Sequence, residues 1–67
     1  MPHLTVNGES RATSGAKTVA DLVHELGLSG KAVAVEINKK IVPRKNHQST
    51  LLNDGDVVEV VTLVGGG

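Results

Sequence analysis

Residues 57–64, VVEVVTLV, form the longest β-prone run in the chain, and the rest of the fold can be worked out from it. Successive side chains of a strand point to opposite faces of a sheet. Val58 and Val60 therefore share one face, whereas Val61 and Leu63 share the other. A strand that is apolar on both faces belongs in the middle of a sheet. If Val58 and Val60 lie beneath a helix, Val61 and Leu63 face solvent.

Four other segments have strand-like patterns, with apolar and polar residues alternating or a short β-branched run. Asn7-Gly8 is a strong hairpin signal, because both central positions of the favoured turn need a positive φ. Pro43 has no amide to donate and should end the strand before it. The strands predicted from these patterns are residues 3–6, 9–12, 32–37 and 41–42.

One helix is predicted between the second and third of these strands. Thr18 is a good N-cap, Asp21 favours the positive end of the helix dipole, and Gly27 suits the position just past the helix end. The apolar stripe consists of Val19, Leu22, Val23 and Leu26. A helix this short is marginal alone and must pack on the sheet. We expect an α+β fold: a mixed sheet of four to five strands, one helix on one face, and the last strand beside the first.

Composition narrows the possible functions. The chain has 67 residues, enough for one small domain over residues 1–67, and its seven basic residues balance seven acidic ones. A neutral chain lacks the positive footprint of a general nucleic-acid or membrane-surface binder. Without cysteine there is no disulfide, thiolate metal site or cysteine nucleophile. No signal segment or membrane span is visible, so a cytoplasmic location is expected.

The C-terminal segment is the candidate functional site. We interpret Val61, Leu63 and the neighbouring Val64 as a docking patch for another protein, although scattered exposed aliphatic residues are also common on surfaces. Gly65, Gly66 and Gly67 have no side chains and can thread a narrow tunnel as a flexible tail. The alternative is a loose chain end without function.

The carboxyl group of Gly67 is the chemical handle that this tail could deliver. A carboxylate is a poor electrophile, because its charge repels nucleophiles. Activation by ATP to an acyl-adenylate would make it reactive, and sulfur could then replace one oxygen to give a thiocarboxylate. In a chain without cysteine, the C-terminal carboxyl is the plausible covalent attachment point for sulfur.

Three motifs in order resemble a known family. Residues 37–44, INKKIVPR, look like an Asn-x-x-x-Val-Pro-Arg segment; Asp54-Gly55-Asp56 precedes the apolar strand; and Gly66-Gly67 ends the chain. Together they resemble the ThiS family of thiamin-biosynthesis sulfur carriers, which belongs to the ubiquitin-like β-grasp superfamily. The resemblance covers the whole chain and implies a β-grasp fold.

The resemblance also implies a reaction sequence in which the chain is a co-substrate and not an enzyme. A ThiF-type adenylyltransferase would adenylate Gly67 with ATP and magnesium, and a cysteine desulfurase would supply sulfur for the thiocarboxylate. The thiazole synthase ThiG would then receive that sulfur. Three alternatives stay open: a molybdopterin-synthase small-subunit-type carrier, a ubiquitin-like protein modifier, and an interaction module with an idle tail.

The remaining charged and titratable residues carry weaker signals. Lys39, Lys40, Arg44 and Lys45 place four positive charges in seven residues. They form either a solvated turn or, for Arg44 and Lys45, a surface that steers the chain toward an acidic partner. The three histidines (His3, His24 and His47) have no ligand spacing on one element, so we expect them to face solvent and to bind no metal.

Overall fold

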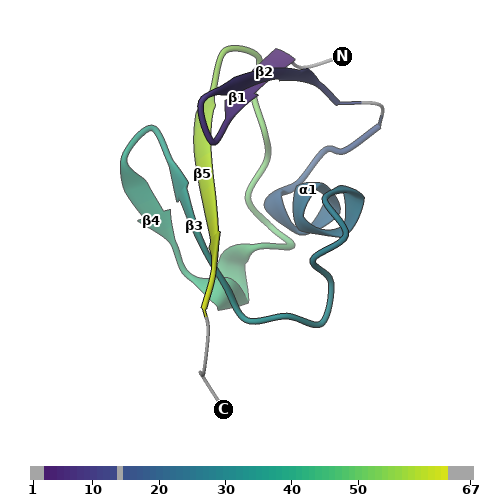
Figure 1. The fold of residues 1–67 in the computed structure, drawn as a ribbon, viewed down its shortest axis with the longest axis vertical. Helices are drawn as coiled ribbons and strands as arrows, with labels where there is room; N and C mark the ends of the chain where they lie inside the picture. Colours follow the sequence, from purple (N-terminus) through teal and green to yellow (C-terminus); the bar gives the residue numbers. More distant parts are fainter. Residues whose placement is uncertain (1–2, 14, 64–67) are drawn as a thin grey trace.

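The computed structural model describes residues 3–13 and 15–63 and shows a curved sheet packed against a helix (Figure 1). Each predicted strand is present, and a short 3-10 helix follows Pro43. The elements are β1 (His3–Val6), β2 (Glu9–Ala12), α1 (Val19–Glu25), β3 (Val33–Ile37), β4 (Lys40–Val42), η1 (Arg44–Asn46) and β5 (Val57–Thr62).

The strands form one five-stranded sheet in the order β2-β1-β5-β3-β4. β5 lies in the centre, parallel to β1 and antiparallel to β3. The two hairpins, β1–β2 and β3–β4, flank it, and α1 covers one face of the sheet (Figure 1). The predicted α+β class, the central last strand and its pairing with the first strand are therefore confirmed.

The core lies between this sheet face and α1 and contains aliphatic side chains without an aromatic residue. Val58 is 0% exposed and Val60 is 6% exposed, whereas their neighbours Val57 and Val61 face solvent. The predicted assignment of the two faces of β5 is therefore correct. The other most deeply buried side chains are Leu4, Val19, Leu22, Val35 and Thr13.

Helix α1 begins with a capping box. The Asp21 amide donates to Thr18 Oγ1 at 3.2 Å, and the Thr18 amide donates to the Asp21 carboxylate at 3.1 Å. The Lys17 amide donates to the same carboxylate, and these two backbone bonds hold the pKa of Asp21 below its ordinary value of 3.8. The helix ends one residue earlier than its stripe suggests, because Leu26 is the C-cap and Gly27 turns left-handed at φ 77°.

The polar segment after η1 supplies hydrogen-bond acceptors to the first turn of α1. The amide of Ala20 donates to the His47 carbonyl at 2.9 Å, and that of Val19 donates to the Thr50 carbonyl at 3.0 Å. First-turn amides have no partner inside a helix, so these bonds explain why residues 44–50 pack on α1 instead of extending into solvent. Within the described residues, no helix is long and apolar enough to cross a membrane.

Two of the motif residues have a structural role. The Asn38 side chain donates to Asp56 Oδ1 at 3.1 Å and accepts from the Val57 amide at 3.0 Å. Asp56 in turn accepts from the Asn53 amide through its other oxygen, at 2.9 Å. The Asn-x-x-x-Val-Pro-Arg and Asp-Gly-Asp motifs thus meet where the β3–β4 turn contacts the start of β5.

Candidate functional site

The sheet face opposite α1 is open and partly apolar along β5. Val57, Val61 and Leu63 are 48%, 57% and 53% exposed, and Ile41 on β4 is 75% exposed. The register places Val61 opposite Ala34, and Glu59 opposite Glu36. The structure therefore exposes Val61 and Leu63 at the end of the central strand, as the strand pattern predicted. Their role in docking a partner stays a prediction.

The chain leaves the sheet from this same end. The Leu63 amide donates to the Ala32 carbonyl at 2.9 Å, so the main chain is attached to the start of β3 as far as Leu63. Val64 of the predicted patch and the predicted tail (Gly65, Gly66 and Gly67) lie outside the described residues.

The Asn7 side chain, which the sequence indicates only as part of a turn, holds the second half of β5 in place. Beyond Val58, β1 no longer pairs with β5, and the Asn7 side chain takes its place. Asn7 Oδ1 accepts from the Val60 amide at 2.8 Å, and Asn7 Nδ2 donates to the Val60 carbonyl at 3.0 Å. Asn7 also holds φ 50°, which asparagine tolerates better than most residues. Its Asn-Gly context indicated only the turn.

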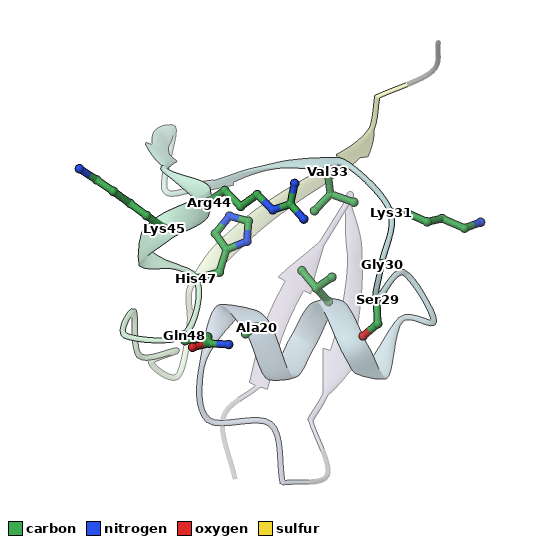
Figure 2. Close-up of a pocket in the computed structure, with 10 residues that line it drawn as sticks. Ala20, Ser29, Gly30, Lys31, Val33, Arg44, Lys45, His47 and Gln48 are labelled. Carbon is green, nitrogen blue, oxygen red and sulfur yellow. The ribbon is translucent and has the colours of Figure 1, made fainter. Parts of the chain in front are cut away.

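A surface cavity of about 470 Å³ lies between α1 and η1, on the helix side of the sheet. Figure 2 shows the Arg44 side chain extending along it toward Val33, with Lys45 and Lys31 projecting outward on opposite sides. Its lining consists of Ala20, Val23, Ser29, Gly30, Lys31, Val33, Arg44, Lys45, His47 and Gln48. The structure therefore places Lys31 in the lining of the same cavity as Arg44 and Lys45, and leaves Lys39 and Lys40 in the β3–β4 hairpin.

One expectation about the histidines is wrong. His47 is only 8% exposed, because its carbonyl accepts from the Ala20 amide and its ring Nε2 lies 3.1 Å from the Val42 carbonyl oxygen. His3 and His24 are exposed, and their rings contact the hydroxyls of Ser10 and Ser29. Among the residues that the structure describes, no three His, Asp or Glu side chains are grouped as metal ligands.

The arrangement defines a class of protein. A five-stranded mixed sheet with a central last strand, wrapped around one helix, is the β-grasp fold of ubiquitin-like domains. Of the solved structures, the crystal structure of the thiamine biosynthesis protein ThiS from Geobacter metallireducens matches with a TM-score of 0.79 and 35% identity, over 97% of this chain and 99% of that one.

Sequence comparison gives the particular family. The ThiS family matches residues 4–67. The sulfur carrier protein ThiS of Thermus thermophilus is 42% identical over 92% of this chain and 95% of its own length. The chain also matches a thiazole synthase of Paramagnetospirillum magneticum, 45% identical over 96% of this chain, but it spans only 20% of that enzyme's length. The chain belongs to the ThiS family of thiamin-biosynthesis sulfur carriers.

Proposed function

We propose that Gly67 is the reactive residue of this sulfur carrier, and that the folded body is a co-substrate for other enzymes and has no catalytic activity of its own. A ThiF-type adenylyltransferase activates the Gly67 carboxylate with ATP and magnesium. A cysteine desulfurase supplies the sulfur, and the thiazole synthase ThiG uses it. Family membership supports this proposal, together with the exposed apolar end of β5 from which the chain continues toward Gly67.

The chemistry needs only a carboxylate on this chain. One carboxylate oxygen attacks the α-phosphorus of ATP, and pyrophosphate leaves. The outer persulfide sulfur that the desulfurase takes from cysteine then attacks the acyl carbon, and AMP leaves with that oxygen. A thiol then reduces the S–S bond and releases the thiocarboxylate, so that one C–O bond is replaced by one C–S bond. Cysteine is absent from the sequence, so no side-chain thiol of the carrier competes for the activated acyl group. ATP and reduced thiols are available together in the cytoplasm, where we place the reaction.

The open end of β5 serves as the recognition surface in this proposal. Val61 and Leu63 are both more than half exposed, and they are among the last residues before the tail. Covering an exposed aliphatic side chain yields about 1.5–3 kcal/mol. A partner that covers both residues therefore gains affinity while it positions the tail, with Gly65 and Gly66 passing through a channel too narrow for side chains.

The thiazole synthase is supported as the acceptor by a second observation. Relatives named thiazole synthase include, within a longer protein, a segment similar to more than nine-tenths of this chain. Joining two proteins in one chain raises their effective concentration, which favours partners that act in sequence. We infer that the carrier described here meets the same kind of enzyme.

Intact-mass measurement tests the proposal. The chain is incubated with ATP, magnesium, a ThiF-type enzyme, a cysteine desulfurase and cysteine, and a variant without Gly67 is treated in parallel. The proposal predicts the mass gain of one oxygen-to-sulfur exchange in the full chain and none in the variant. An unchanged full chain would refute it. Adducts of much higher mass, joined through Gly67 to lysines of other proteins, would indicate a protein modifier instead.

A further inference from the structure

The cavity between α1 and η1 gathers positive charge without a matching negative charge. Lys31, Arg44 and Lys45 line it, and no carboxylate does. Within residues 3–13 and 15–63, the ion pair found is that of Arg11 with Glu25, at 3.2 Å, and it involves none of the three. All three side chains are exposed, and Figure 2 shows Arg44 between the two outward-pointing lysines. We call this group the basic rim.

The basic rim makes the distribution of charge over this neutral molecule uneven. The chain has seven basic and seven acidic residues, so it is not attracted as a whole to a charged partner. Asp54 and Asp56 lie just before β5 begins, near Lys39 and Lys40 of the β3–β4 hairpin, whereas the rim lies near the end of that strand. Positive and negative charges lie close together at the start of β5, whereas no carboxylate lines the cavity at the rim, so the rim end is the positive end in the field of a charged surface.

The basic rim lies near the end of β5, from which the chain continues toward Gly67. Val33 lines the cavity and pairs with Thr62, the last residue of β5. Four residues follow Leu63. An extended chain spans at most about 3.6 Å per residue, so four residues reach at most about 14 Å. An enzyme that takes the Gly67 carboxylate must therefore bring its own surface close to the basic rim.

We propose that the basic rim receives Asp or Glu side chains of the adenylating enzyme, located beside the opening that takes the tail. This inference rests on the function proposed above and adds a second contact on the opposite side of the sheet from Val61. The planar fork of Arg44 matches a carboxylate in a two-bond geometry. A free phosphate fits less well, because the nearby Lys31 amide already donates to the Leu28 carbonyl at 3.1 Å and the cations are exposed.

The contact acts mainly on the rate of association. Exposed charges at the edge of an interface steer the encounter and add little to the lifetime of the complex. Such steering is screened as the Debye length falls from about 10 Å at 0.1 M salt to about 3 Å at 1 M. The rim therefore selects the approach in which the tail points at the enzyme.

Charge reversal in matched pairs tests the inference. The variant Arg44→Glu/Lys45→Glu is compared with Lys39→Glu/Lys40→Glu, which changes the net charge equally but lies at the hairpin near the start of β5. Association and dissociation rates with the adenylating enzyme are measured by stopped flow at both salt concentrations. At about 0.1 M salt we expect the rim variant to associate about tenfold more slowly than the hairpin variant. Its dissociation rate changes less than about twofold, and the difference in association disappears near 1 M.

Equal association rates for the two variants would overturn the inference, and so would a slowdown that persists at 1 M salt. Saturable binding of inorganic phosphate to the free chain below about 1 mM, followed by NMR shifts at Lys31 and Arg44, would overturn it as well, since the cavity would then be a phosphate site. Failure of the proposed function is recognised separately: the unaltered chain would then gain no sulfur, whatever the rates of the variants.

Discussion

Removal of the Asn7 side chain should loosen the end of β5 specifically. Asn7 makes two hydrogen bonds to the main chain of Val60, at 2.8 and 3.0 Å, where β1 no longer reaches. Asn7→Gly removes both bonds and keeps the positive φ without strain. Each bond contributes about 0.5–1.5 kcal/mol, so the expected loss is about 1–3 kcal/mol in the free energy of unfolding. At about 0.05–0.15 kcal/mol per residue, that is a large share of the stability of a chain this short.

Two measurements together check this prediction. Urea denaturation gives the total loss, and amide hydrogen exchange locates it. The Val60 amide should lose more protection than the amides of β3, which pair with β5 from the other side and report global unfolding. Asn7→Asp is the matched comparison for the donated bond, because aspartate also tolerates a positive φ and still accepts from the Val60 amide, but it sets a carboxylate oxygen against the Val60 carbonyl oxygen. It should therefore also lose protection at Val60.

The same measurements show how firmly the strand end that carries the proposed docking residues is held. Val60 directly precedes Val61, so a freed Val60 main chain would leave the proposed docking residues on a strand end that is held from one side only. A loss below about 0.5 kcal/mol, or a Val60 amide that stays as protected as the β3 amides, would show that the two bonds do not secure this segment.

Three further predictions address the core, the helix start and the docking patch. Leu22→Ala, at a fully buried site, should cost about 2–5 kcal/mol in urea denaturation, and a cost under about 1 kcal/mol would contradict the described packing. Asp21 has a lowered folded-state pKa, so its stabilising effect is present above 3.8 and is lost as the pH falls through the folded value. Asp21→Asn should therefore be less stable than the unaltered chain at neutral pH, with a gap in urea midpoints that closes in acid; a gap of constant size at every pH would refute the assignment. Leu63→Asp should weaken binding to the adenylating enzyme at least about tenfold while thermal melting stays unchanged. Leu51→Asp, at another exposed leucine, is the control, and equal weakening by both would exclude a specific patch.

The parts of the fold that local patterns encode could be predicted from the sequence. Alternation along residues 57–62 determines which side chains of β5 are buried, and Thr18 with Asp21 marks the helix start through bonds three residues apart. The Asn7-Gly8 turn was recognised for the same reason. In each case the physical cause lies within a few residues of the signal.

Contacts between distant segments could not be read in the same way. The Asn7 side chain meets Val60 across 53 positions, and no periodicity links them. His47 looked like an exposed residue of a polar loop, but its carbonyl satisfies a first-turn amide of α1 and its ring is buried there. Lys31 joins Arg44 and Lys45 only because the loop before β3 and η1 border the same cavity.

Isotope tracing tests most directly whether the Gly67 carboxylate is the reactive group. The chain is prepared with both oxygens of the Gly67 carboxylate labelled with a heavy isotope, and it is then incubated with the adenylating enzyme, ATP, magnesium and the sulfur source. The account predicts that one heavy oxygen leaves in AMP and that the other remains beside sulfur on Gly67. Thiocarboxylate formation with unlabelled AMP, or sulfur attached anywhere else on the chain, would contradict it.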